Sequence, residues 1–129
     1  EQYHLTKQIK FIDHCEDMAL AYKVSDIIVS ASIEPEAFGR VAVEAQSMEK
    51  LIIASNIGGS NETINDEKTG FLFKSGDAES LSKKIIRGLT MDETSINLMG
   101  KEGRNNIIKK FNVEKMCFST YSEYKRLLN

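Results

Sequence analysis

Two glutamates eight positions apart, Glu36 and Glu44, are the residues of this chain whose type and spacing most suggest chemistry. Glu44 stands in the apolar run Val41–Ala45, where a charge is costly unless something pairs with it or it acts on a ligand. A carboxylate accepts hydrogen bonds from neighbouring hydroxyls, such as the vicinal diol of a sugar. On spacing alone another interpretation is favoured, in which Glu36 is an exposed loop acid and Glu44 pairs with a nearby cation.

A second pattern is the glycine pair Gly58-Gly59, which follows an apolar run and is expected in a loop. This loop and the loop through Glu36 each lead into a predicted helix, whose free amides and positive dipole end favour an anion such as phosphate. The glycines let the backbone come close to such a group. A glycine pair is weak evidence by itself, because it more often marks an ordinary turn.

The elements that must position these residues are short apolar runs that alternate with amphipathic segments. The runs predict strands at 10–12, 26–30, 51–54 and 71–73, and the second and third are continuous enough to be buried on both faces. Helices are predicted at 16–23, 38–49, 60–65, after an Asp77 cap, at 93–111, and at 113–128 after an Asn112 cap. In the helix over 38–49, Phe38 is expected on the apolar face.

This alternation predicts an α/β fold, a Rossmann-like doubly wound parallel sheet with helices on both faces. In such a sheet, ligands collect outside the carboxyl ends of the strands, at the crevice where the strand order reverses. The loops that carry Glu36 and Gly58-Gly59 both leave the carboxyl ends of predicted strands. The sequence therefore predicts that Glu36 faces this crevice, with Glu44 two turns deeper along its helix.

Composition and charge bound the class of protein. With 129 residues, 41% hydrophobic and 28% charged, the chain has the size and composition of one globular domain. The net charge of −2 divides into −6 over residues 1–100 (10 Lys+Arg, 16 Asp+Glu) and +4 over residues 101–129 (7 and 3). The acidic part argues against a nucleic-acid partner, and the basic segment is best explained as a solvated helix face, with peripheral membrane contact as the alternative.

The cellular location follows from what the sequence lacks. Cys15 and Cys117 lie far apart without metal-type spacing, so reduced thiols in a cytosolic protein are expected. No basic, apolar leader marks the chain for export. We therefore expect a cytoplasmic protein, with the inner face of the membrane as a further location.

The stretch SDIIVSASIEPEAFGRVAVEAQSMEKLIIASNIGGSNETINDEKTGFLF resembles the C-terminal domain of retaining glycosyltransferases with the GT-B fold, the large family-4 group. That family has a Glu-x7-Glu motif ending in Glu-Ala, a Gly-Gly loop followed by Glu, and a Thr-Gly turn before a short strand. Here these are Glu36 to Glu44, Gly58-Gly59 with Glu62, and Thr69-Gly70. The likeness extends from Phe11 to the last predicted helix, and the ordered set is much more specific than any one motif.

The resemblance implies a substrate, a UDP- or GDP-linked sugar, and no metal or other cofactor. Glu44 would bond the ribose hydroxyls, and Glu36, the candidate catalytic residue, would position the donor sugar. Arg40 either reaches the diphosphate or is merely exposed to solvent. The further positions implied in donor binding are Ala37, Phe38, Gly39, Gly58 and Gly59.

The implied reaction is transfer of a hexose-type sugar to an acceptor glycan or lipid, such as those of the cell envelope, with the anomeric configuration kept. Negative charge grows on the departing diphosphate, and helix termini and cations stabilise it. We expect residues 1–129 to be about three-quarters of the C-terminal, donor-binding domain, inactive alone and without the N-terminal acceptor domain.

The chain departs from the family pattern at three places. Glu49-Lys50-Leu51 replaces the usual Gly-x-Pro, which removes an easy left-handed helix end at a cost of about 1 kcal/mol at most. Asp13 stands where a glycine is usual after the first predicted strand. Lys7 and Lys10 do not match the Arg and Lys with which the family grips the diphosphate.

Two other classes of function stay open at this point. A nucleotide-sugar epimerase of the GT-B fold would need catalytic acids that the sequence does not reveal. A non-catalytic doubly wound binding or regulatory module, such as a receiver-like domain, would need a phospho-accepting aspartate at a strand's carboxyl end, and Asp26 stands at a strand's start. A transferase domain that binds the donor without catalysis is a variant of the second class.

Overall fold

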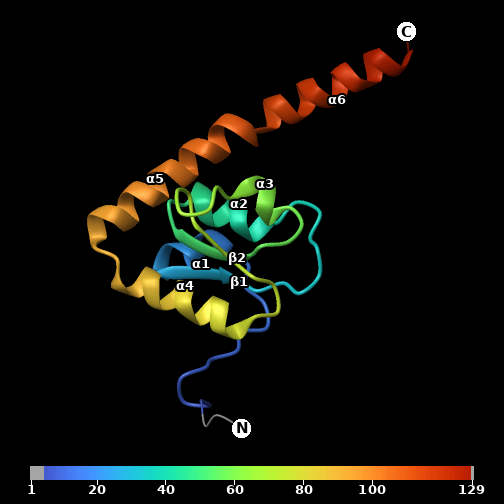
Figure 1. Ribbon diagram of the computed structural model, residues 1–129. Coiled ribbons are helices and arrows are strands. Elements are labelled where there is room, and N and C mark those ends of the chain that lie inside the picture. Colours follow the sequence, from blue (N-terminus) through green and yellow to red (C-terminus); the bar gives the residue numbers. More distant parts are fainter. Residues whose placement is uncertain (1–4, 129) are drawn as a thin grey trace.

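A sheet of three parallel strands forms the centre of the protein, and the computed structural model, which describes residues 5–128, has helices on both of its faces (Figure 1). Strands β1 (Ile27–Ser30), β2 (Leu51–Ser55) and β3 (Phe71–Phe73) lie in the order β1-β2-β3. Ile28 pairs with Ile52, and Ile53 pairs with Phe71. The predicted α/β fold with a parallel sheet is confirmed.

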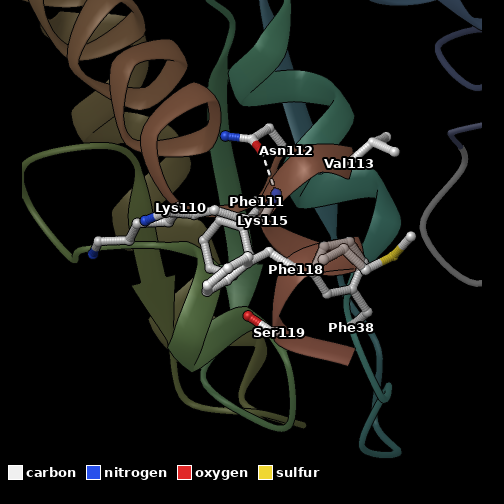
Figure 2. Close-up of a pocket in the computed structure, with 9 residues that line it drawn as sticks. Phe38, Lys110, Phe111, Asn112, Val113, Lys115, Phe118 and Ser119 are labelled. Carbon is white, nitrogen blue, oxygen red and sulfur yellow. Dashed lines mark hydrogen bonds between the residues drawn. The ribbon is translucent and has the colours of Figure 1, made fainter. Parts of the chain in front are cut away.

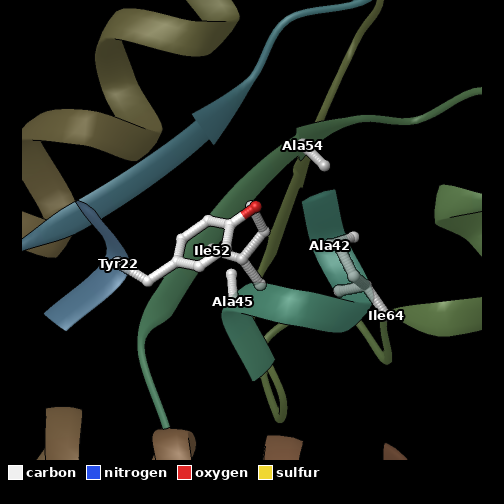
Figure 3. Close-up of a cluster of buried hydrophobic side chains, with 6 residues drawn as sticks. All are labelled: Tyr22, Ala42, Ala45, Ile52, Ala54 and Ile64. Carbon is white, nitrogen blue, oxygen red and sulfur yellow. The ribbon is translucent and has the colours of Figure 1, made fainter. Parts of the chain in front are cut away.

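One face of the sheet is covered by the first two helices. Ile52 packs here against Tyr22 of α1 (Met18–Val24) and against Ala45 of α2 (Arg40–Ser47) (Figure 3). These side chains are at most 4% exposed. Burying a side chain the size of Ile52 contributes about 1.5–3 kcal/mol to the free energy of unfolding, so this contact fixes both helices on the sheet.

The opposite face is covered by the helix that follows the last strand, and the next helix reaches this face through Met99 while it packs mainly along α2. Ile53 lies in a second buried cluster with Met99, and α4 (Ala78–Thr90) and α5 (Glu93–Lys110) pack against it. Because neighbouring side chains of a strand point to opposite faces, β2 is buried at all five positions. The prediction that this strand is buried on both faces is confirmed.

All six predicted helices are present, each within two residues of its predicted bounds. The predicted caps are also found: the Asp77 carboxylate accepts from the Ser80 amide (3.0 Å), and the Asn112 side chain from the Lys115 amide (2.8 Å). The Ser80 amide lowers the pKa of Asp77, since it stabilises the charged carboxylate. Asn112 starts α6 (Val113–Leu128), and α3 covers Ser60–Thr63.

Three sequence-based expectations about strands are wrong or incomplete. Residues 10–12 form no strand, and Phe11 is 89% exposed, because they pair with none of the described strands. Val29 is 41% exposed, since β1 pairs with β2 alone within the described chain and is covered less completely than β2. The three described strands follow their chain order and contain no reversal, so the predicted reversal of strand order stays a prediction.

Helix α6 differs from the rest of the fold because it extends away from the sheet (Figure 1). None of its described side chains is buried, and the apolar ones among them include Met116, Phe118 and Tyr121. Across residues 5–128, no helix has the length and apolar character that crossing a bilayer requires.

Candidate active site

Three loops meet at the carboxyl edge of the sheet, as the parallel arrangement requires. The loop after β1 contains Glu36, the loop after β2 contains Gly58-Gly59, and the loop after β3 contains Ser75. The Ser75 hydroxyl donates to the Ser32 carbonyl (3.2 Å), which ties the third loop to the first. Asp26 lies just before β1, at the opposite edge, so it is not placed to act in a receiver-like site at this edge.

The Gly58-Gly59 pair brings the second loop into direct backbone contact with the first. A Cβ atom on Gly58 would lie 2.5 Å from the Glu36 carbonyl oxygen, and one on Gly59 would lie 2.4 Å from the Phe38 carbonyl carbon. The Gly59 amide donates to the Glu36 carbonyl (2.8 Å). The glycines therefore allow the close approach of the two loops, while contact of their amides with a phosphate stays a prediction.

Glu36 lies in the exposed part of the first loop, just before the helix, as predicted. Its carboxylate accepts a hydrogen bond from the Ser32 hydroxyl four residues earlier. The bond between Ser32 and Glu36 thus joins two parts of the same loop, and the Gly59 amide binds the loop backbone at the Glu36 carbonyl. This arrangement fixes the backbone of Glu36 and leaves its side chain accessible to a ligand.

Glu44 lies on α2, and the structure shows how its charge is tolerated beside the apolar core. The Tyr22 hydroxyl donates to Oε2 (2.8 Å), and the Arg40 guanidinium contacts Oε1 (3.0 Å). The Glu44 side chain is 36% exposed. The alternative favoured by spacing, a cation partner for Glu44, is therefore present, and that cation comes from the preceding turn of the same helix.

The contact with Glu44 changes the pKa of Tyr22. Burial, the hydrogen bond to Glu44 and the negative charge of Glu44 raise the pKa of Tyr22 to about 12. The hydroxyl is therefore a protonated donor over the physiological range. Sequence analysis did not single out Tyr22, although a tyrosine in a helix facing the core carries a hydroxyl that usually finds a partner when buried.

The start of α2 differs from its prediction by two residues. The helix begins at Arg40, because Gly39 adopts a left-handed conformation (φ +73°) as its N-cap. The Gly39 carbonyl accepts from the amides of Ala42 (3.0 Å) and Val43 (3.3 Å), and no side chain caps this helix end. Ala37 and Arg40 are exposed on either side of it.

Phe38 consequently lies outside the helix, and its predicted place on the apolar face of α2 is wrong. Its ring packs edge-to-face against Phe111 with 5.7 Å between the centroids. Phe38 borders a cavity of about 660 Å³ at the junction of α5 and α6, with Lys110 and Phe118 among its other lining residues (Figure 2). The left-handed Gly39 turns the chain, so the ring points away from the sheet.

The described residues, 5–128, contain no group of three or more His, Cys, Asp or Glu side chains that could hold a metal ion. The charged groups of the Glu36 loop and of α2 suit an organic ligand that carries both hydroxyls and negative charge. Two carboxylates can accept from hydroxyls, and one exposed guanidinium and an uncapped helix start can bind an anion.

Comparisons with known proteins agree with one another. A family model described as glycosyl transferases group 1 matches residues 1–109. The capsular polysaccharide biosynthesis glycosyltransferase CapM of Staphylococcus aureus is 29% identical over 120 residues, which are 93% of this chain and 31% of that protein. The UDP-Gal:alpha-D-GlcNAc-diphosphoundecaprenol alpha-1,3-galactosyltransferase of Escherichia coli is 32% identical over 112 residues, 87% of this chain and 28% of its own.

A solved structure shares the fold over nearly the whole chain. A glycosyltransferase from Rickettsia africae ESF-5 is 38% identical, with a TM-score of 0.92 over 99% of this chain and 34% of its own. The chain spans about a third of the length of the relatives that it matches.

Proposed function

This chain belongs to the family of group 1 glycosyl transferases, and on that premise we propose that it is the donor-binding part of a retaining glycosyltransferase. The donor is a nucleotide-diphosphate sugar. The chain corresponds to the C-terminal half of a GT-B fold, and a separate N-terminal domain would supply the acceptor site.

The observation that carries this proposal is the way the loop over residues 36–39 is held at the start of α2. The Gly59 amide binds the Glu36 carbonyl, and the start of α2 is free of a side-chain cap. Arg40, the first residue of the helix, has a side chain that is 84% exposed. Free amides and a cation at one helix end form a suitable site for a diphosphate.

The two carboxylates take the parts of the donor that carry hydroxyls. A carboxylate beside a phosphate would repel it, but a carboxylate beside a diol accepts two hydrogen bonds. We assign Glu44 to the ribose hydroxyls and Glu36, together with the backbone of residues 37–39, to the donor sugar. Gly58 and Gly59 lie against this loop. The Gly59 amide is engaged with the Glu36 carbonyl, so we expect the Gly58 amide to approach the phosphates once the donor is bound.

In the proposed reaction, the bond between the anomeric carbon and the diphosphate oxygen breaks, and a bond to the acceptor hydroxyl oxygen forms. The nucleoside diphosphate leaves with the electron pair, and its departing oxygen takes up the proton that the acceptor hydroxyl loses. The amides at the start of α2 and Arg40 stabilise the negative charge that grows on this leaving group, so no metal is required. Glu36 orients the sugar, and the configuration at the anomeric carbon is retained.

The donor and acceptor classes follow from the relatives. The Escherichia coli relative acts, by its name, on UDP-Gal and a diphosphoundecaprenol-linked sugar, and CapM belongs to capsular polysaccharide biosynthesis. We propose a UDP-sugar, with a GDP-sugar as the alternative, and an acceptor glycan or lipid of the cell envelope. Such a reaction would occur in the cytoplasm, at the inner face of the membrane when the acceptor is a lipid.

Calorimetric titration of the intact protein with UDP and GDP tests the proposal. The Glu44→Ala variant should bind the preferred nucleotide at least about tenfold more weakly, because it loses charge-assisted hydrogen bonds worth about 1.5–3 kcal/mol. Transfer of radiolabelled sugar from the matching donor would then identify the sugar.

The matched control is Glu79→Ala, which also removes one partner of an ion pair between residues four apart on a helix. Glu79 pairs with Lys83 (2.7 Å) on α4, which packs on the face of the sheet opposite to α2 and Glu44, so its removal should leave nucleotide affinity unchanged. Equal nucleotide affinities of the Glu44→Ala variant and the unmodified protein would refute the ribose assignment.

A further inference from the structure

We infer that Tyr22 is a positioning residue of the donor site, which holds the Glu44 carboxylate in the orientation that receives the ribose. This inference rests on the proposed role of Glu44 in binding the donor. Tyr22 belongs to α1, a different element from the loop and helix that carry the rest of the site.

The two oxygens of Glu44 have partners of opposite kinds. Tyr22, which donates to Oε2, is 4% exposed, and its ring is packed among Ala42, Ala45 and Ile52 of the core. Arg40, which contacts Oε1, is 84% exposed and is held on the long stem of a flexible side chain. One partner is thus fixed by the core, whereas the other can exchange with a ligand.

The strengths of the two contacts differ for the same reason. An exposed ion pair between residues four apart on a helix contributes little, because water screens it and both side chains lose rotamer freedom. A hydrogen bond from a buried hydroxyl to a carboxylate contributes more, because one partner is charged and the hydroxyl has little access to water. The Tyr22 contact therefore decides the side-chain orientation of Glu44.

This division of labour matches what a ribose-binding carboxylate requires. A carboxylate has about four acceptor positions, so Oε2 can keep the Tyr22 bond while it accepts a further hydroxyl. Oε1 becomes available when Arg40 leaves it. Arg40 is then free to turn to the diphosphate, whose charge is larger than that of one carboxylate. When the donor binds, it would replace Arg40 as the partner of Oε1, while Tyr22 would keep its hydrogen bond to Oε2.

A purely structural role for the bond between Tyr22 and Glu44 explains less of the geometry. A purely structural hydrogen bond would satisfy the Tyr22 hydroxyl, but the backbone of a neighbouring helix could serve that need as well. Here the acceptor is the side chain of a proposed ligand-binding residue, and its second oxygen points toward an exposed cation. Tyr22 therefore fixes one carboxylate oxygen of Glu44, and the other oxygen is accessible to a ligand that displaces Arg40.

The test is Tyr22→Phe in the intact protein, which removes the hydroxyl and keeps the ring in the core. Binding is titrated with UDP or GDP, whichever the unmodified protein prefers, and with the 2′,3′-dideoxy form of the same nucleotide. We expect affinity for the ribonucleotide to fall about tenfold and affinity for the dideoxy nucleotide to stay unchanged, because only the former has hydroxyls for Glu44 to bind.

The matched control is Tyr124→Phe, the same chemical change on the exposed α6, which should leave both affinities unchanged. Equal weakening of both nucleotides by Tyr22→Phe would indicate a general structural effect and would overturn the inference. So would an unchanged affinity for the ribonucleotide.

A parallel titration of Glu44→Ala separates this inference from the proposed function. If Glu44→Ala weakens ribonucleotide binding while Tyr22→Phe does not, the ribose role of Glu44 stands and the role of Tyr22 fails. If Glu44→Ala binds both nucleotides like the unmodified protein, the proposed ribose role of Glu44 fails, and the inference fails with it.

Discussion

The two ends of the parallel sheet are built from loops of opposite character. At the amino end, the turn over residues 66–70 is fastened at almost every position. The Asp66 carboxylate accepts from the Leu72 amide (2.8 Å), the buried Thr69 hydroxyl accepts from the Asn65 amide (2.9 Å), and Glu67 pairs with Lys84 (2.7 Å).

The carboxyl end is held by its backbone and leaves its side chains exposed. The Gly59 amide and the Ser75 hydroxyl fasten the loop after β1 at its main chain, while Glu36, Ala37 and Arg40 are exposed. The difference teaches that one family signature combines two roles. Thr69-Gly70 serves the stability of the sheet, whereas the Glu36 loop is held at its backbone with its side chains exposed, which suits the ligand-binding role that we propose for it.

The largest expected effect is that of Gly70→Ala at the amino end. A Cβ atom there would lie 2.8 Å from the Ile52 carbonyl oxygen and 2.6 Å from Ile52 Cγ2, so the central strand would have to move. We expect the free energy of unfolding to fall by about 3 kcal/mol. Urea denaturation followed by circular dichroism measures this.

Gly76→Ala is its control, because it lies after β3 at the carboxyl end and a Cβ atom there meets nothing within 4 Å. Its φ of +74° still disfavours alanine, which costs about 1 kcal/mol. If Gly70→Ala were as mild as this control, the amino end would not be the rigid end of the sheet.

An intermediate effect of opposite sign is expected for Glu49→Gly, also at the amino end. Glu49 has a left-handed backbone (φ +57°) just after the Met48 C-cap of α2, the place where the family resemblance predicts a glycine. Its ion pair with Arg104 (3.7 Å) is about half exposed and contributes little. Glycine should raise the free energy of unfolding by about 1 kcal/mol, as thermal melting would show.

Glu67→Gly is the matched comparison, since Glu67 is left-handed as well (φ +68°). Glu67 also forms ion pairs with Lys84 and Arg87, which lower its pKa, so the substitution loses about as much as it relieves. A stabilisation by Glu67→Gly that equals that of Glu49→Gly would show that these ion pairs contribute nothing.

The smallest effect on stability is expected at the carboxyl end, for Glu36→Ala. The exposed Glu36 side chain makes one hydrogen bond, to Ser32, so the free energy of unfolding should change by no more than about 0.5 kcal/mol. Transfer of sugar by the intact protein should nevertheless fall strongly. Full activity of this variant would remove Glu36 from the site, and a large loss of stability would erase the contrast between the two ends.

Much of the fold follows from local patterns in the sequence. The apolar strand over Leu51–Ser55 and the caps Asp77 and Asn112 are visible as residue types in order, because strand burial and helix capping depend on neighbours along the chain. The 10–12 run failed as a strand because a strand forms only where another strand pairs with it. Glu49, where the usual glycine is missing, proved to be left-handed as its position implied.

For the candidate site, the order of strands and helices predicted that the Glu36 loop and the glycine pair leave the same edge of the sheet, as the structure has them. Spacing alone left the partner of Glu44 open between a cation and a ligand, and the resemblance to the family grouped these residues as a site. The contact with Tyr22 joins residues 22 positions apart, so no spacing rule contains it. The place of Phe38 against Phe111 depends in the same way on how two distant segments meet.

By itself, the order of residues determined which segments become strands and helices and which loops leave the carboxyl edge of the sheet, since these are properties of short range. Only the folded chain decided that the glycine pair presses on the Glu36 loop and that a buried tyrosine holds Glu44. Such contacts arise when the packing of the core brings side chains and backbone from separate elements within bonding distance.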